Sequence, residues 1–224
     1  MNADWAGPPV VLFDLDGTLT ASGPGILASV RHALRALGEP IPDEAVLAAF
    51  IGPPLLDSFT GPCGLPPARA QDAIAAYREH YSEQGQYENS VYAGVPELLG
   101  ALTDAGRTVA LATSKAQVYA ESILAHFGLT GFFTVVVGSE LDGRRTRKAE
   151  VIAEVLARLD RPAADCVMIG DRAHDVIGAL AVGMPCVGVL WGYGSAQELA
   201  SAGADALVRA PADLHALLLP ASMR

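Results

Sequence analysis

The sequence is poor in basic residues and has no long apolar run. Its 224 residues include 15 Lys and Arg against 25 Asp and Glu, a formal net charge of −10. A nucleic-acid-binding protein needs basic surface to neutralise phosphates, so we expect no nucleic-acid polymer as a partner. The apolar stretches fall far short of the roughly 20 residues that cross a bilayer, so we expect no membrane association. Residues 1–9 lack the basic-then-apolar pattern of a secretory signal, which favours a cytoplasmic location.

Cysteine is scarce as well. Cys63, Cys166 and Cys186 are odd in number, widely spaced and without a C-x-x-C pair. This pattern argues against a disulfide or zinc framework and predicts reduced, buried thiols. Charged residues make up only 18% of the chain and hydrophobic residues 51%, so the chain is no disordered acidic tail and can bury a full core.

Short apolar runs alternate with helical patterns in much of the chain. Runs typical of strands buried on both faces lie at residues 10–13, 108–112, 133–137, 166–169 and 185–190. Helical patterns separate the later runs, at residues 95–105, 116–127, 148–158 and 175–182. This alternation predicts an α/β fold with a doubly wound, Rossmann-like parallel sheet. No G-x-G-x-x-G follows the first strand, so we expect no dinucleotide site.

The alternation is absent between residues 20 and 90. Helical patterns lie there at residues 25–37, 43–50, 53–59 and 67–84, with Pro and Gly at their joints. A connection of about 70 residues far exceeds the usual 2–6 residues. We therefore predict a core formed by residues 1–19 and 91–224, with an inserted α-helical domain formed by residues 20–90.

Two carboxylates stand where the first strand ends, in Asp14-Leu15-Asp16-Gly17-Thr18. Open α/β sheets bind their ligands at the carboxyl ends of strands. Carboxylates two residues apart are costly to desolvate unless a cation or a proton lies between them. Gly17 lets the backbone approach a ligand closely, and amides nearby can form an anion nest. An Asx-turn in water is the alternative, but the buried strand before the motif favours a functional site.

A second acidic motif, Gly170-Asp171 to Asp175, follows the run at 166–169. Asp171 and Asp175 are four residues apart, so at a helix start both can face the same side. Asp175 acting only as a helix cap is the alternative. Together with the first motif, these carboxylates predict an oxygen-rich site that suits Mg²⁺.

Two more segments carry groups that suit a phosphate. Thr113-Ser114-Lys115 follows the run at 108–112, and a hydroxyl and amides there can bind phosphate oxygens, although an ordinary N-cap is the alternative. Lys148 starts a helical pattern and so opposes the helix dipole, which is easier to explain if a phosphate or carboxylate needs it. The basic run at 144–147 is expected in a solvated loop, and His174 in a supporting role.

In chain order, Asp14-Leu15-Asp16-Gly17-Thr18, Thr113-Ser114, Lys148 and Gly170-Asp171 to Asp175 resemble the four motifs of the haloacid dehalogenase superfamily of phosphohydrolases. The resemblance covers nearly the whole chain. Residues 19–26, 50–54, 92–99 and 192–195 are similar to its phosphoglycolate phosphatase-like and 5′-nucleotidase-like subgroup. In that subgroup the helical insertion is a cap placed just after the first motif.

The resemblance implies a Mg²⁺-dependent phosphomonoester hydrolase that acts on a small organic phosphate in the manner of a phosphoglycolate phosphatase. Asp14 would attack phosphorus and form an aspartyl-phosphate, while Asp16 would act as acid and then as base. The implied metal ligands are Asp14, Asp16 through its backbone carbonyl, Asp171 and Asp175. The implied phosphate-binding residues are Gly17, Thr18, Thr113, Ser114 and Lys148.

Several alternatives stay open. A 5′-nucleotidase acting on nucleoside monophosphates and a sugar phosphomutase would share all four motifs, and a non-catalytic binding module is the non-enzymatic alternative. Asp16 argues against a haloalkanoate dehalogenase, and the absence of Lys from residues 20–90 argues against a phosphonate hydrolase. Candidates for recognising the substrate are Arg31, Arg35, Arg69, Arg78, Phe50, Phe59, Tyr77 and Tyr81. We expect a monomer or a homodimer.

Overall fold

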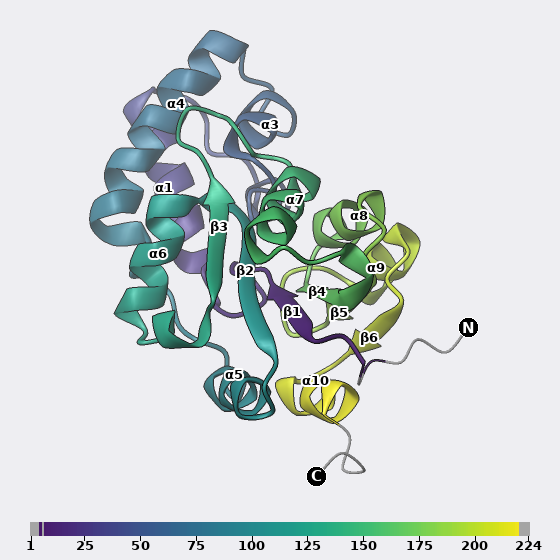
Figure 1. Cartoon of the computed structure of the whole chain (residues 1–224). Helices are drawn as coiled ribbons and strands as arrows, with labels where there is room; N and C mark the ends of the chain where they lie inside the picture. Colours follow the sequence, from purple (N-terminus) through teal and green to yellow (C-terminus); the bar gives the residue numbers. More distant parts are fainter. Residues whose placement is uncertain (1–4, 6, 220–224) are drawn as a thin grey trace.

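A six-stranded parallel sheet organises the computed structural model, which describes residue 5 and residues 7–219 (Figure 1). The strands are β1 (Val10–Phe13), β2 (Thr108–Ala116), β3 (Val135–Ser139), β4 (Cys166–Gly170), β5 (Cys186–Val189) and β6 (Ala206–Val208). Their order is β3-β2-β1-β4-β5-β6, and every pairing is parallel. The chain therefore winds outward in both directions from β1, which confirms the doubly wound sheet and puts the switch point between β1 and β4.

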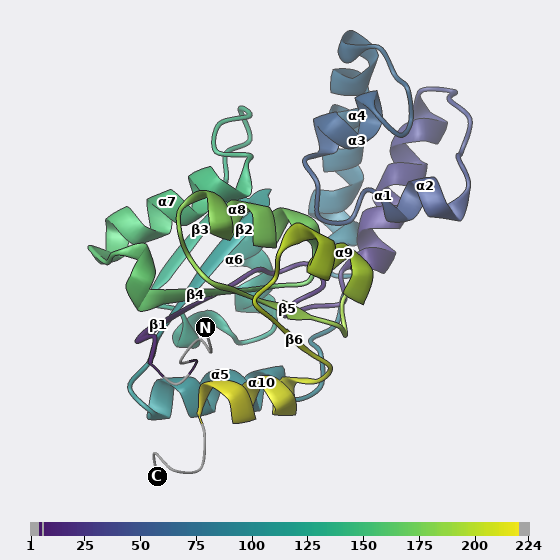
Figure 2. The same cartoon turned by 90° about the vertical axis from the view of Figure 1, so that its right-hand side faces the viewer.

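Helices cover both faces of this sheet, as Figure 2 shows. One face packs against α5 (Val95–Asp104), α6 (Gln117–His126) and α10 (Pro211–Leu218), and the other against α7 (Lys148–Leu159), α8 (Ala173–Ala181) and α9 (Ala196–Ala202). Val11 and Phe13 point into the first layer, whereas Val10 and Leu12 point into the second. A strand with both faces buried has no polar face, which explains the unbroken apolar run at its position in the sequence.

The helices of residues 20–90 form a separate cluster beside the sheet (Figure 2). They are α1 (Gly23–Ala36), α2 (Glu44–Ala48), α3 (Leu55–Thr60) and α4 (Pro67–His80), which continues as a π-helical turn over Tyr81–Gly85. Val30, Phe59 and Tyr77 are among the buried residues of their own apolar core. The two connections to the sheet lie side by side, because Ala21 N donates to Ser90 O at 2.7 Å.

The structure also differs from some of the expectations. The third strand begins two residues later than predicted and ends at Ser139, and the second runs on to Ala116. The short edge strand β6 and the helices α9 and α10 had no prediction, since a strand of three residues leaves almost no alternating pattern. Among the free cysteines, Cys166 and Cys186 are buried, but the prediction is wrong for Cys63, which is half-buried in a surface turn after α3. None of the described helices is both long and apolar enough to cross a membrane.

Candidate active site

The two aspartates of the first motif lie at the carboxyl end of β1, beside the switch point of the sheet. Asp14 N donates to Ile169 O at 2.9 Å, so the backbone leaves the sheet only after Asp14. Gly17 then turns the chain with a φ of +87°, and a Cβ at this position would collide with the carboxylate of Asp171. Asp14 and Asp16 are thereby held with only 5% and 7% of their surface exposed. Such burial is costly for two ionised carboxylates unless cations accompany them.

Three buried carboxylates converge at this edge, those of Asp14, Asp171 and Asp175. Each offers one oxygen, and these oxygens lie within 4.8 Å of one another. Burial raises the pKa of Asp171 well above its usual value, and the charges of Asp175 and Asp14 raise it further. Burial likewise raises the pKa of Asp14, although Lys148 opposes the shift. A set of hard oxygen donors whose mutual repulsion favours protonation fits a divalent cation such as Mg²⁺.

Asp175 caps the helix α8, which confirms the structural interpretation of this residue, and it also lies in the carboxylate cluster. Its Oδ2 accepts the N–H of Arg172 at 3.1 Å, while its Oδ1 lies 2.7 Å from Lys148 Nζ. The helix N-terminus thus fixes one oxygen and leaves the other toward the cluster.

Lys148 is the first residue of α7, and its ammonium group lies inside the carboxylate cluster. Its Nζ lies 2.6 Å from Asp14 Oδ1 and donates to Ala112 O at 2.9 Å. Burial alone would lower the pKa of Lys148, but the charges of Asp14 and Asp175 outweigh it and hold the pKa above its usual value. Gly178 on α8 makes room, because a Cβ there would lie 2.6 Å from the Cβ of Lys148. The lysine at the unfavourable end of a helix is therefore held by carboxylates.

A small cavity of about 10 Å³ lies among these groups. Its lining consists of Asp14, Asp16, Gly52, Thr113, Ser114, Lys115, Lys148, Arg172, His174 and Asp175. Gly17 and Thr18 contact Asp171 instead, and Thr18 Oγ1 donates to Asp171 Oδ1 at 3.2 Å. Three of the five predicted phosphate-binding residues therefore line the small cavity, namely Thr113, Ser114 and Lys148.

His174 also lines this cavity. Burial lowers the pKa of His174, as do the charges of Arg172 and Lys148, so this imidazole is neutral near pH 7.

A large pocket of about 250 Å³ lies next to the small cavity and shares four lining residues with it, Asp16, Gly52, Ser114 and Lys115. The candidates for substrate recognition that line it are Phe50, Tyr77, Tyr81 and Arg78. Phe59 lies instead in the apolar core of α1–α4. Among the other candidates, Arg31 pairs with Glu44 and Arg69 with Glu39 on the surface, and Arg35 is exposed.

Lys115 belongs to this site although the sequence reasoning gave it no role. Its Nζ lies 3.0 Å from Asp16 Oδ2 and donates to Tyr81 Oη at 2.6 Å. The same ammonium group lies 4.4 Å from the centre of the Tyr81 ring. Its side chain is only 6% exposed. The sequence signal that could have identified Lys115 was its position two residues after Thr113, near the carboxyl end of β2. This strand extends further along the chain than the sequence predicts.

The loop after β5 hydrogen-bonds to the carboxylate of Asp171. This is a second part of the site that the sequence did not reveal. Tyr193 N donates to Asp171 Oδ2 at 2.8 Å, and Tyr193 Oη accepts the N–H of Gly23 at 2.6 Å. A Cβ at Gly192 or Gly194 would collide with Asp171. The glycines on either side of Tyr193 are therefore required by close packing, and Tyr193 joins the acidic cluster to the start of α1.

The family of the protein follows from comparison with known proteins. A profile of the haloacid dehalogenase-like hydrolases matches residues 11–189. The chain therefore belongs to this family, as the four motifs predict.

Three relatives of this chain have names that state an activity. A 5′-nucleotidase of Pseudomonas aeruginosa is 49% identical over 85% of this chain and 86% of that protein. A tyrosine-protein kinase, PtkA of Mycobacterium tuberculosis, is 45% identical over 85% of this chain, which spans only 65% of that protein. A phosphoglycolate phosphatase of Cupriavidus necator is 36% identical over 95% of this chain and 94% of that protein.

A solved structure also has the same fold as this chain. The crystal structure of a predicted phosphatase from Clostridium acetobutylicum matches with a TM-score of 0.91 and 42% identity, over 94% of this chain and 97% of that chain. The phosphatases among these proteins confirm the enzyme class that the motifs predict, a phosphoric monoester hydrolase of the haloacid dehalogenase type.

Proposed function

We propose that the protein is a Mg²⁺-dependent phosphomonoester hydrolase that forms an aspartyl-phosphate on Asp14. The observation that carries this proposal is the convergence on Asp14 of one buried ammonium group and two further buried carboxylates. Lys148 orients Asp14 through a contact of 2.6 Å and brings positive charge to the place where a phosphoryl group would bind. Preorganised charge of this kind is the main contribution that proteins make to phosphoryl transfer.

Two steps would complete the reaction. In the first, an oxygen of Asp14 attacks phosphorus, the ester P–O bond breaks, and Asp16 gives its proton to the departing oxygen. In the second, water attacks phosphorus and gives a proton to Asp16, and the bond between phosphorus and Asp14 breaks to release inorganic phosphate. The placement of Asp16 supports this role. Lys115 holds its Oδ2, while its buried Oδ1 has no hydrogen-bond partner among the described residues and can exchange a proton.

The metal would be held by Asp14, Asp171, Asp175 and the backbone carbonyl of Asp16. Bound there, Mg²⁺ would supply positive charge against the phosphoryl oxygens. The chain itself would hold these oxygens through the hydroxyls of Thr113 and Ser114 and the ammonium group of Lys148. Gly17 and Thr18 would act indirectly, because they would fix the backbone and the carboxylate of Asp171 and would not bind the phosphoryl oxygens themselves.

Residues 20–90 would serve as a cap that opens and closes over the site. Gly52 lines the small cavity, Arg172 Nη1 donates to Ile51 O, and Lys115 donates to Tyr81. A cavity of about 10 Å³ has the room of about one water molecule. A phosphoryl group can enter only if some of these contacts open. The paired connections at Ala21 and Ser90 are the place where the chain could hinge.

The large pocket favours a leaving group of nucleoside size over phosphoglycolate. Its volume of about 250 Å³ and its aromatic lining exceed what a two-carbon acid would fill. Its two cations have partners in the chain, because Lys115 pairs with Asp16 and Arg78 donates to Leu141 O. A substrate carboxylate would therefore find no cation without a partner among the described lining residues. The name of the 5′-nucleotidase relative agrees with this preference.

A panel of phosphate esters with Mg²⁺ tests the proposal. We expect kcat/KM to be higher for nucleoside 5′-monophosphates than for phosphoglycolate by at least tenfold. A higher value for phosphoglycolate would contradict the substrate preference and leave the reaction in place. No turnover of any ester, including an aryl phosphate, would instead support the non-catalytic alternative.

A further inference from the structure

The segment that joins β3 to α7, residues 140–147, forms one wall of the large pocket. We call it the β3–α7 loop. It starts after Ser139, whose Oγ donates to Ser114 O at 2.8 Å, and it ends just before Lys148. In Figure 2 it projects beyond the edge of the sheet beside α7, on the side where α1–α4 also stand. The loop thus begins and ends beside two candidate phosphate-binding residues, while its middle lines the pocket that would hold the leaving group.

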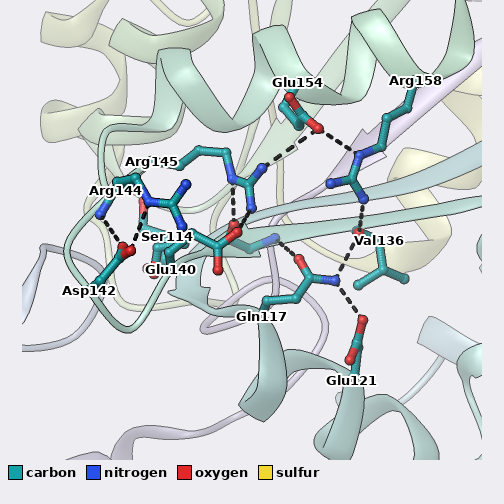
Figure 3. Close-up of polar contacts among 12 residues, drawn as sticks. Ser114, Gln117, Glu121, Val136, Glu140, Asp142, Arg144, Arg145, Glu154 and Arg158 are labelled. Atoms are coloured by element: carbon teal, nitrogen blue, oxygen red, sulfur yellow. Dashed lines mark hydrogen bonds and ion pairs between the residues drawn. The ribbon is translucent and has the colours of Figure 1, made fainter.

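Arg145 holds this loop in place, as Figure 3 shows. Its Nε donates to Gly138 O at 3.1 Å, its Nη2 pairs with Glu140, and its Nη1 lies 3.6 Å from Glu154 Oε1 on α7. The guanidinium therefore joins the start of the loop to the helix that follows it. Arg145 does so with a φ of +57°, in the left-handed region that residues other than glycine rarely adopt. Such a conformation persists where the surroundings fix it, and it is frequent at functional sites.

Two exposed leucines, one of them on the loop that Arg145 supports, form an apolar rim on the pocket. Leu141 is 42% exposed, and Leu56 of α3, another residue of the pocket lining, is 38% exposed. The acidic side chains of the loop are paired, Glu140 with Arg145 and Asp142 with Arg144. Arg78 of α4 donates to Leu141 O at 3.0 Å and so joins the loop to the helical segment. A leaving group that reached this rim would bury exposed leucine surface, which is favourable for an apolar or aromatic face.

We propose that the β3–α7 loop determines leaving-group specificity, with Leu141 as a contact residue and Arg145 as the positioning residue. The favoured substrates are phosphate esters whose neutral leaving group carries an extended apolar or aromatic face. This inference rests on the proposed phosphatase function and adds to it a specificity element from the core, outside residues 20–90.

The test compares a substrate too small to reach the rim with two that extend to it. We would measure kcat and KM with Mg²⁺ for acetyl phosphate, adenosine 5′-monophosphate and 1-naphthyl phosphate. Leu141→Ser should lower kcat/KM for the two large esters about three- to tenfold, and leave acetyl phosphate within about twofold. Arg145→Ala should give a larger loss for the large esters, mainly through KM, and Arg145→Lys should restore part of it.

Arg158→Ala is the matched control. Arg158 donates to the same oxygen of Glu154 at 2.8 Å, but it makes none of the contacts that hold the loop (Figure 3). We expect it to leave all three substrates unchanged. Leu141 is exposed, so its variant tests the inference even where Arg145→Ala fails to fold.

Three results would contradict the inference. Equal losses for acetyl phosphate and the large esters would show that the loop acts on the reaction and not on specificity. Hydrolysis of acetyl phosphate alone by the unaltered protein would show that the large pocket admits no extended leaving group, although phosphoryl transfer to water would still take place. Failure to hydrolyse any of the three with Mg²⁺ would overturn the proposed function, and this inference with it.

Discussion

The small cavity and the large pocket lie side by side but are built in opposite ways. Charged side chains at the carboxyl ends of parallel strands, with Lys148 and Asp175 at helix starts, supply most of the small cavity. Aromatic and apolar side chains supply about half of the lining of the large pocket, and most of them belong to residues 20–90. Burying so much charge is costly, whereas an apolar lining can be built from many different side chains. Under the proposed function, the small cavity would carry out the reaction and the large pocket would select the leaving group.

The largest effect should come from the two aspartates that face the small cavity. Asp14→Asn removes the nucleophile, so turnover should fall by ~10⁴-fold or more with no covalent adduct. Asp16→Asn removes the proton carrier, which is typically worth ~10²–10⁴-fold. With an aryl phosphate, whose leaving group needs little protonation, Asp16→Asn should still phosphorylate Asp14 and then stall. Rapid quench and mass spectrometry should find one phosphoryl group on Asp14. An adduct on Asp16, or none in either variant, would break the assignment of roles.

Metal removal should have the next largest effect. Chelation should abolish hydrolysis, and Mg²⁺ should restore it while Ca²⁺, which is larger, restores it poorly. Full turnover in excess EDTA would contradict the metal site.

Stability should respond to the metal in a pH-dependent way. Burial and like charges raise the pKa of Asp171 and Asp14 in the folded protein without metal. A carboxyl with a raised folded-state pKa destabilises the fold at pH values above that pKa, and the penalty disappears as the pH falls below the unfolded value. At one fixed Mg²⁺ concentration, the gain in Tm should therefore increase as the pH rises through these raised pKa values, and it should be roughly 5–10 °C where that concentration is about 100 Kd. A gain that shrinks as the pH rises would contradict it.

The same contrast explains what the sequence could and could not predict. Asp14 and Asp171 follow unbroken apolar runs and Lys148 precedes a helical pattern, so their meeting at one sheet edge could be predicted from the topology. The lining of the large pocket could not be predicted from the topology of the sheet. It comes from helix faces and loop backbone, and their relative placement depends on packing. Phe50 and Phe59 look alike in the sequence, yet only Phe50 lines the pocket. Lys115 was missed because β2 continues past the end of its apolar run and includes this residue.

Lys115 connects the two cavities, and its substitution should sharpen the comparison. Lys115→Met removes the partner of Asp16 Oδ2, so kcat should fall by ~10–10²-fold, more for alkyl phosphates than for aryl phosphates, which need less protonation. Tyr81→Phe removes only the hydroxyl that accepts from Lys115 and should cost a few-fold. Tyr77→Phe, the same deletion in the ring stacked on Tyr81, is the control and should change little. Equal losses for alkyl and aryl esters would show that Lys115 does not act through Asp16.

The smallest effect is expected for Arg31, which lies within residues 20–90 but lines neither cavity. Arg31 was a candidate for recognising the substrate, but it pairs with Glu44, whose side chain is 77% exposed, at 2.7 Å. Surface ion pairs are worth ~0–1 kcal/mol, so Arg31→Gln should leave kcat/KM within about twofold for every ester. Phe50→Leu changes the lining of the large pocket and should alter the ratio of kcat/KM between adenosine 5′-monophosphate and acetyl phosphate. If Arg31→Gln shifts this ratio and Phe50→Leu does not, then specificity depends on a different face of the helical segment, and the large pocket is not where the leaving group binds.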